Sequence, residues 1–195
     1  MGRERGTTLV EMVVVAGLVA LLSVVSVPIL GQAAADARAH GAARYVATKV
    51  HAARLEAARR GAHVALQFQV VDGGVRFTAF VDGNGNGVRS ADIASGVDRP
   101  LGPSDALGDH FGDVDFAVVF STPGIDGGAA VALGDDPIRL GAANMLSWSP
   151  VGSATSGTLY VAGPRGPQFA VRIFGATGRT RVLRFDPGAG AWRPH

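Results

Sequence analysis

The sequence predicts an α+β fold in which one long N-terminal α-helix, membrane-spanning and then amphipathic, packs on an antiparallel β-sheet head domain. Three observations predict it. Residues 9–30 are almost wholly apolar, residues 31–60 are rich in helix formers without proline, and residues 61–195 alternate short apolar runs with turn residues. Most of the 28 glycines and 10 prolines fall in that last part. We therefore expect a helix to residue 60 and a turn-rich sheet after it.

The apolar run from Leu9 to Leu30 is long enough to cross a membrane, since about 20 residues of helix at 1.5 Å each span a hydrocarbon core of roughly 30 Å. Arg3 and Arg5 precede the run, and such positive charge holds an N-terminus in the cytoplasm. An ordinary secretory signal peptide is the alternative. It would be cut on the far side of the run, near residues 33–35.

Glu11 and Pro28 are unusual inside such a run. An ionised carboxylate costs roughly 2.5 to 3.5 kcal/mol at the bilayer centre, so Glu11 needs a partner unless it only reaches back to the membrane interface. Pro28 removes a backbone hydrogen bond and predicts a kink. Both residues favour a helix that packs against other helices over a removable signal peptide.

The segment Gly6-Thr7-Thr8-Leu9-Val10-Glu11-Met12 resembles the class III leader of type IV prepilins and pseudopilins. The resemblance implies that a prepilin peptidase cuts after Gly6 and methylates the new amine of Thr7, although the family usually has phenylalanine at that position. It also implies that Glu11 pairs with the Thr7 amine of a neighbouring subunit inside an apolar filament core, where an opposite charge offsets desolvation. Pro28 falls where family helices carry proline.

These features divide the chain into four parts: a leader (1–6), a transmembrane and polymerisation helix (7–30), the amphipathic half of the helix (31–60) and a globular β domain (61–195). In the third part a single stripe of small apolar residues recurs at three- and four-residue steps and predicts packing on a sheet. Its members are Ala43, Val46, Val50, Ala53 and Ala57. We expect the basic residues around the stripe to form a solvated face, and Gly61 to cap the helix. Those basic residues are Arg44, Lys49, Arg54, Arg59 and Arg60.

Alternating apolar residues predict a β-hairpin from residues 64–70 and 75–81, joined by Asp72-Gly73-Gly74. Further strands are expected at residues 116–121, 145–149, 158–162, 169–174 and 181–185. We expect loops at residues 95–112 and 122–144 and, apart from these, antiparallel sheet in one or two layers. Residues 51–60, 146–152, 157–161 and 177–181 resemble minor pilins and pseudopilins of the FimT/GspH type.

Asp82-Gly83-Asn84-Gly85-Asn86-Gly87 resembles the first half of an EF-hand calcium loop. Asp82, Asn84, Asn86 and Asp92 are therefore weak calcium candidates. The pattern is incomplete, because Ile93 stands where a bidentate glutamate is required. A tight turn between strands is the simpler interpretation, since glycine and asparagine accept positive φ. We expect no cofactor.

Arg179 and Arg181 lie on one side of a predicted strand and could bind phosphates through forked, permanently charged donors. Arg184 and Arg172 are nearby. Some FimT-like subunits take up DNA with an arginine motif near the C-terminus, so the resemblance implies DNA as a candidate partner. The alternative is an edge strand on which arginine discourages pairing with another sheet.

No enzyme is predicted. The chain has no cysteine, its five histidines have no ligand-like spacing, and it lacks the nucleophile-elbow, P-loop and zinc-protease motifs. The resemblance instead implies a minor pilin or pseudopilin of a type IV pilus or type II secretion system. Its implied partners are the prepilin peptidase, other pilin subunits, membrane lipid and the inner-membrane assembly platform. Its implied location is the bacterial inner membrane, single-pass with the head in the periplasm, followed by the pilus or pseudopilus. The alternative function is a DNA-binding minor pilin for natural transformation.

Overall fold

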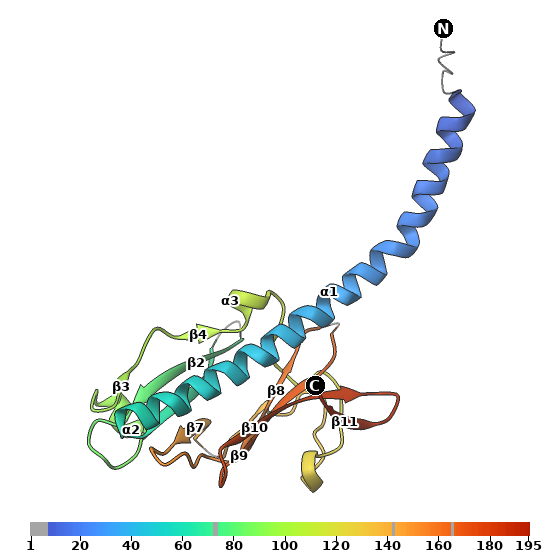
Figure 1. Ribbon diagram of the computed structural model, residues 1–195. Coiled ribbons are helices and arrows are strands. Elements are labelled where there is room, and N and C mark those ends of the chain that lie inside the picture. Colours follow the sequence, from blue (N-terminus) through green and yellow to red (C-terminus); the bar gives the residue numbers. More distant parts are fainter. Residues whose placement is uncertain (1–7, 72–73, 142, 165) are drawn as a thin grey trace.

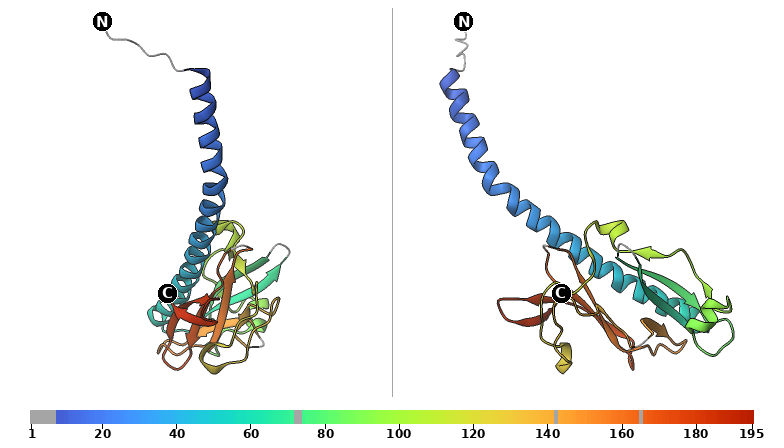
Figure 2. Two further views of the ribbon diagram at one scale, coloured as in Figure 1. Left: turned by 90° about the vertical axis from the view of Figure 1, so that its right-hand side faces the viewer. Right: turned by 180° about the vertical axis from the view of Figure 1, so that it is seen from behind.

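A computed structural model describes residues 8–71, 74–141, 143–164 and 166–195, apart from the side chains of residues 24–28. One long helix, α1 (Leu9–Arg60), runs from near the N-terminus into a β-rich head. The N-terminal half of α1 projects from the head as a curved rod, and the other half lies along the head (Figures 1 and 2). The predicted combination of helix and antiparallel sheet is therefore confirmed.

The local sequence explains where α1 begins and ends. Thr8 adopts an extended conformation, and its hydroxyl oxygen accepts the backbone N–H of Glu11 at 3.3 Å, as in an N-terminal cap. Gly61 has φ 64° and closes the helix in the left-handed conformation, as predicted. The helical backbone continues without a break through residue 28, where a kink was expected, and α1 curves along its length (Figure 1).

The first sheet contains the predicted hairpin, β1 (Val64–Val71) and β2 (Gly74–Val81), paired in antiparallel register from Val64–Val81 to Val71–Gly74. The tip at residues 72–73 lies outside the described residues. The other strands of this sheet are β3 (Arg99–Pro100), β4 (Asp105–Ala106) and β7 (Met145–Trp148). Its path in the described chain is β3-β2-β1-β7, with β4 also on β2.

The second sheet follows the order β11-β10-β9-β8-β5 in the described chain, with β6 also on β8. Its strands are β5 (Asp115–Phe116), β6 (Ile138–Arg139), β8 (Gly157–Ala162), β9 (Phe169–Phe174), β10 (Arg179–Asp186) and β11 (Ala191–Pro194). Two short helices, α2 (Ser90–Ala94) and α3 (Gly108–Phe111), and one 3₁₀ turn (Ile125–Gly127) lie in the connections.

The core lies between α1 and the two sheets. α1 contacts β1 and β7 of the first sheet and β8, β9 and β10 of the second. The predicted helix stripe is fully or almost fully buried: Ala43, Val46, Val50, Ala53 and Ala57. Small side chains allow the helix to approach the strands closely, and the strands supply larger ones, among them Leu66, Trp148, Phe169 and Ile173.

Two expectations for the connections were wrong, and one strand was missed. The strand expected at residues 116–121 ends at Phe116, because the buried side-chain oxygen of Gln168 accepts the N–H groups of Val119 and Phe120 and replaces the strand ladder there. The loops expected at 95–112 and 122–144 contain short strands and helical turns. Strand β11 was not predicted.

The outer faces of both sheets are covered by connecting segments. Val88 packs with Ala65 and Met145 on the far side of the first sheet. Val118, Ile125 and Val131 pack with Tyr160, Ala170 and Leu183 on the far side of the second. The middle of the sequence, which shows no clear apolar period, thus covers the sheet faces that α1 does not contact.

Candidate functional site

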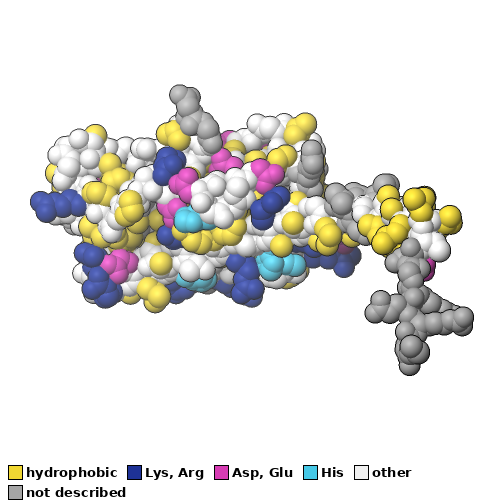
Figure 3. All heavy atoms as spheres, turned by 90° about the horizontal axis from the view of Figure 1, so that it is seen from above, with side chains coloured by type: hydrophobic (Ala, Val, Ile, Leu, Met, Phe, Trp, Pro, Cys, Tyr) yellow, Lys and Arg dark blue, Asp and Glu magenta, His cyan; other side chains and the backbone are white. Residues whose placement is uncertain are grey.

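The N-terminal half of α1 exposes many large apolar side chains, which gather on the rod in Figure 3. Their exposed fractions run from 52% at Val15 to 81% at Leu9. Burying such side chains gains about 1 to 3 kcal/mol each. A row of this length is therefore a surface built to be covered by another apolar phase.

Glu11 lies at the start of this rod. Its backbone N–H is bound by Thr8, and its carboxylate stands in the first turn of α1, where the positive end of the helix dipole favours a negative charge. The spacing Thr8-x-x-Glu11 matches a capping box, a signal in the sequence that the interpretation of Glu11 as an assembly residue overlooked. The acid is compatible with helix initiation as well as with a partner on another chain.

Over the residues that the structure describes, no helix is at once long enough and apolar enough to span a membrane. The span expected at residues 7–30 includes residue 7 and the side chains of residues 24–28, which lie outside the description.

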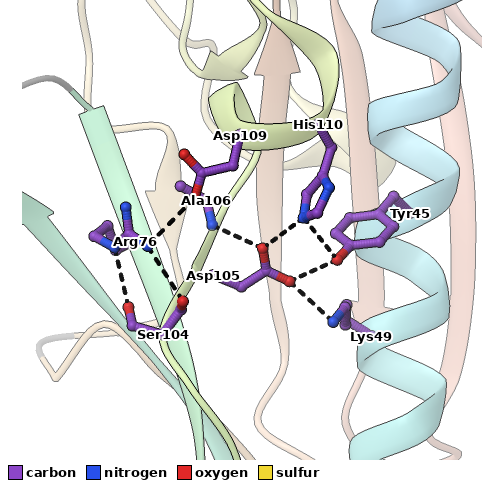
Figure 4. Close-up of polar contacts among 8 residues, drawn as sticks. All are labelled: Tyr45, Lys49, Arg76, Ser104, Asp105, Ala106, Asp109 and His110. Carbon is purple, nitrogen blue, oxygen red and sulfur yellow. Dashed lines mark hydrogen bonds and ion pairs between the residues drawn. The ribbon is translucent and has the colours of Figure 1, made fainter.

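A polar cluster fastens α1 to the head on one side (Figure 4). The Asp105 carboxylate, on β4, accepts hydrogen bonds from Tyr45 Oη at 2.6 Å and pairs with Lys49 Nζ at 2.9 Å. His110 Nε2 lies 2.9 Å from the other carboxylate oxygen and 3.2 Å from Tyr45 Oη. Lys49 is therefore half-buried and paired with a carboxylate of the head, and the prediction that it belongs to a solvated face was wrong.

The electrostatics of this cluster favour ionised Asp105. Burial alone would raise the pKa of Asp105, but hydrogen bonds from Tyr45, Lys49 and His110 lower it to about 2. Burial likewise opposes the charge of Lys49, yet Asp105 and Tyr45 raise the pKa of its ammonium group. The carboxylate thus links one helix face to the segment 105–110 and sets how the rod meets the head.

A second attachment lies where α1 enters the head. Arg184 of β10 pairs with Asp36 of α1 at 2.8 Å. The His40 ring stacks on Phe169 at a centroid distance of 5.8 Å, and the ring of C-terminal His195 meets His40 edge-on at 4.3 Å. Desolvation, followed by nearby positive charge, lowers the pKa of His40. The sequence did not indicate that these two histidines meet.

The far end of α1 is held by Arg54. Its guanidinium carbon lies 5.5 Å from the centre of the Trp148 ring, and Nη1 donates to the carbonyl of Gly178 at 3.3 Å. Arg54 was also expected on a solvated face, and its contacts with β7 and the β9–β10 turn correct that expectation. Arg44 and Arg59 are exposed, as predicted.

The predicted DNA-binding arginines all lie on β10 but have different surroundings: Arg179, Arg181 and Arg184. Arg179 is exposed, and Arg181 is half-buried with its guanidinium 5.9 Å from the centre of the Phe174 ring. Arg184 points to the opposite face of the strand and is paired with Asp36. The three residues therefore do not form one patch.

The calcium candidates lie in a loop that is closed by its own hydrogen bonds. The Asp82 carboxylate accepts the N–H groups of Asn84, Gly85 and Gly87 at 2.8 to 3.1 Å. Burial by itself would raise the pKa of Asp82, and these bonds lower it below its usual range. Asn84 Oδ1 accepts the N–H of Asn86 at 3.2 Å, and Asn84 Nδ2 lies 3.5 Å from Asp92. Tight-turn chemistry accounts for this loop.

Asp98 is a structural residue of the same loop that sequence reasoning missed. It is 1% exposed and accepts the N–H groups of Gly83 and Arg89, each at 2.9 Å. Among the described residues, no group of three or more His, Cys, Asp or Glu side chains is placed to hold a metal ion.

Comparison with known proteins gives one clear relative. The chain is 36% identical to Pilin-like protein PilA1 of Thermus thermophilus over 123 residues, which cover 62% of this chain and 68% of the relative. The chain belongs to the pilin-like proteins. No protein-family model matches it, and no solved structure matches it.

Membership of the pilin-like proteins agrees with the architecture, a long helix whose free half leads into a helix-and-sheet head. It indicates a structural subunit associated with a pilus or the cell envelope. The processing residues Gly6 and Thr7 lie outside the described residues.

Proposed function

We propose that this pilin-like chain is a minor pilin or pseudopilin of a type IV pilus or a type II secretion system. One observation carries the proposal: the first half of α1 is an exposed apolar rod that continues without a break into a half fastened to the head. In water this rod is unfavourable, and bundled with rods of other subunits it becomes a filament core. The head then lies on the filament surface.

The sequence supports the steps before assembly. The leader Met1 to Gly6 fits cleavage by a prepilin peptidase after Gly6, which leaves a new amine on Thr7 for methylation. The apolar run from Leu9 to Leu30 and the arginines at positions 3 and 5 support an inner-membrane stage with the head in the periplasm. An inner-membrane assembly platform would then move the rod from lipid into the filament.

Glu11 is proposed to guide docking. Its carboxylate would accept the amine of Thr7 from an adjoining subunit, and Pro28 would accommodate the packing of the rods. In the apolar core this pairing stabilises both charges, whereas either charge alone would be costly.

The processing test is mass spectrometry of the N-terminal peptide, after the full-length chain has been produced together with its prepilin peptidase. We expect the chain to begin at Thr7, with or without a methyl group. A start near residues 33–36 would instead establish an ordinary signal peptide and remove the proposal.

The assembly test compares Glu11→Ala and Glu11→Gln with Glu56→Gln in cells that make the filament. Glu56 pairs with Arg59 on the head-bound half of α1, so it is a control for loss of a helix carboxylate. We expect the Glu11 variants to reach the membrane but to enter sheared filaments at least tenfold less well. Equal incorporation of Glu11→Ala and Glu56→Gln would remove the proposed role of Glu11.

A second candidate function is DNA capture for natural transformation. Arg179 and Arg181 favour it, because both lie on β10 and neither forms an ion pair within the described residues. The measurement is binding of duplex DNA to the full-length chain in non-ionic detergent at several salt concentrations. We expect weaker binding and a smaller salt slope for Arg179→Ala with Arg181→Ala, and no change for Arg60→Ala, whose guanidinium pairs with Glu56. Unchanged binding in the double variant would remove this function.

A further inference from the structure

Three arginines lie across the second sheet at facing positions. Arg139 of β6 faces Thr158 of β8, Thr158 faces Arg172 of β9, and Arg172 faces Arg181 of β10. Directly opposed residues of antiparallel strands point to the same face, so this arginine row (Arg139, Arg172, Arg181) lies on one side of the sheet. Arg172 Nη1 donates to the Thr158 hydroxyl at 3.3 Å, which confirms the shared side.

The arginine row is on the face away from α1. Leu159, Val171 and Ile173, which alternate with the row, are buried in the core that includes α1. The side of the row instead carries Tyr160, Ala170 and Leu183, covered by the segment 118–131. In a filament whose core is made of α1 rods, this face would remain accessible from outside.

The covering segment places carboxylates on the row. Asp135 pairs with Arg139 at 2.8 Å. Asp126, in the 3₁₀ turn, reaches Arg172, but its oxygen stays 3.6 Å from Nε, beyond hydrogen-bond distance. Arg172 Nε is buried and has no hydrogen-bond partner among the described atoms. An anionic oxygen within hydrogen-bond distance would stabilise a guanidinium N–H that is removed from water and lacks an acceptor.

Asp126 lies in the left-handed region of backbone conformation, with φ 53° and ψ 40°. Aspartate and asparagine enter this region more readily than other non-glycine residues. Glycines surround it, at positions 124, 127 and 128. The turn thus accommodates Asp126 in this conformation and pairs it with Arg172 only loosely.

A hollow of about 360 Å³ lies beside this pair, between the Pro123–Asp126 turn and the β10–β11 hairpin. Arg181 and Trp192 line it. Arg172 and Arg181 lie 5.4 and 5.9 Å from the centre of the same Phe174 ring, and Arg181 has no ion pair within the described residues. Two guanidinium groups thus lie close together, and the hollow beside them is lined by Arg181 and by the Asp126 carboxylate that pairs loosely with Arg172.

We propose that Arg172 and Arg181 form a binding site for the phosphodiester groups of a DNA strand, and that Asp126 is a built-in competitor that occupies the site until DNA displaces it. This inference rests on the candidate DNA-capture function and changes its residues. Arg172 replaces Arg184, which is committed to Asp36 on the other face. The affinity for DNA is then set by how much more strongly the arginines bind the DNA phosphates than the Asp126 carboxylate.

The test measures binding of a fluorescent single-stranded thymidine oligonucleotide to the full-length chain in non-ionic detergent. Asp126→Asn removes the competing charge and keeps a side chain that tolerates the left-handed conformation, so we expect affinity to rise about three- to tenfold. Asp109→Asn is the matched control, because it removes one exposed carboxylate that pairs with Arg76 on the other sheet. Asp126→Gly removes the charge as well and also accepts a positive φ, so it should bind DNA at least as tightly as Asp126→Asn.

The arginines are tested in the same assay. Arg172→Ala with Arg181→Ala should lower affinity at least tenfold and reduce the salt slope by about 1.4, since two phosphate contacts to a single strand are lost. Arg172→Lys with Arg181→Lys keeps the charge and should retain most of the salt slope, which separates lost contacts from a damaged sheet. Arg193→Ala, which breaks the pair between Arg193 of β11 and Asp186 of β10, should leave binding unchanged.

Two results would overturn the inference: equal affinities for Asp126→Asn and Asp109→Asn, or unchanged binding in the double alanine variant. Neither result bears on filament assembly. Suppose that one of these DNA results is found, that the double alanine variant enters filaments normally and that the Glu11 variants do not. Then the DNA site is refuted and the proposed subunit role stands. If Glu11→Ala assembles as well as the unaltered chain, the proposed subunit role loses its docking step whatever the DNA result.

Discussion

At the scale of single residues, Asp105 shows how one carboxylate can join two elements that are far apart in sequence. It takes hydrogen bonds from Tyr45 and Lys49 on α1 and from His110 on α3 (Figure 4). The apolar spacing of α1 gave no sign of this cluster, because a carboxylate in a loop has no periodicity. Tyr45 and Lys49, four residues apart on α1, were the available signal.

Asp105→Asn is expected to destabilise the head by about 2 kcal/mol at pH 7, since the folded-state pKa is about 2 and the unfolded value is about 3.9. A lowered pKa means that this stability is present above the unfolded value and is lost as pH falls through the folded one. The difference in unfolding free energy between Asp105→Asn and the unaltered chain should therefore shrink as the pH falls from about 4 to about 2. Thermal unfolding of the full-length chain followed by tryptophan fluorescence measures it.

Asp109→Asn is the control for that prediction, because Asp109 is exposed and pairs with Arg76 at 3.3 Å. A change within about 0.5 kcal/mol is expected for it. If both variants behave alike across the pH range, the cluster around Asp105 does not stabilise the head.

Gly178 is a second residue with a specific requirement, at the turn between β9 and β10. Its φ is 63°, and an added Cβ would collide with the carbonyl of Gly152 and lie 2.6 Å from the Trp148 ring. Gly178→Ala should therefore destabilise the head by more than about 2 kcal/mol. Gly190 has φ 60° but open space around it, so Gly190→Ala should cost only about 1 kcal/mol. Urea denaturation of the two variants checks the difference, and equal costs would contradict the close packing at Gly178.

At the scale of elements, α1 carries two different surfaces on one continuous helix. The head-bound half buries a stripe of small residues, whereas the free half exposes large apolar ones. Both surfaces were predicted from the sequence, because a helical period and an apolar run depend only on local order. Within the described residues, the large apolar side chains of the free half stay exposed.

Val50→Ala and Leu55→Ala test the two faces of the bound half. Val50 is 0% exposed, so shortening it should cost about 2 kcal/mol of head stability through the cavity that it leaves. Leu55 is 70% exposed, and Leu55→Ala should change stability by less than about 0.5 kcal/mol. Thermal unfolding of both variants is the measurement. A larger loss for Leu55→Ala would show that the helix is rotated relative to the described packing.

The strands show where element prediction stops. Alternation located β1, β2, β8 and β9 well, because each buries one face or both against a core. It overextended the strand that ends at Phe116, where a buried side-chain amide, Gln168, takes the backbone N–H groups. It missed β11, whose four residues are mostly exposed and have no apolar period.

At the scale of the whole molecule, two sheets and a helix share one core, and loop segments close the outer sheet faces. Three contacts hold the bound half of α1 along its length. They are formed with Asp105 of β4, Arg184 of β10 and Trp148 of β7. The head and the bound half of α1 therefore form one unit, from which the apolar half of the helix projects (Figure 2). This arrangement suits a subunit whose helix is buried in a filament while its head remains outside.

The sequence alone determined the helix and its end at Gly61, the buried stripe from Ala43 to Ala57, the first hairpin and the apolar character of the free rod. These depend on local spacing, capping and composition, which short segments carry by themselves. Only the tertiary structure decided that Arg184 turns to Asp36, that Arg172 and Arg181 share a face with Asp126, and that Asp105 fastens α1. Those pairings depend on strand register and loop path, which arise when the core closes and leave no periodic pattern in the sequence.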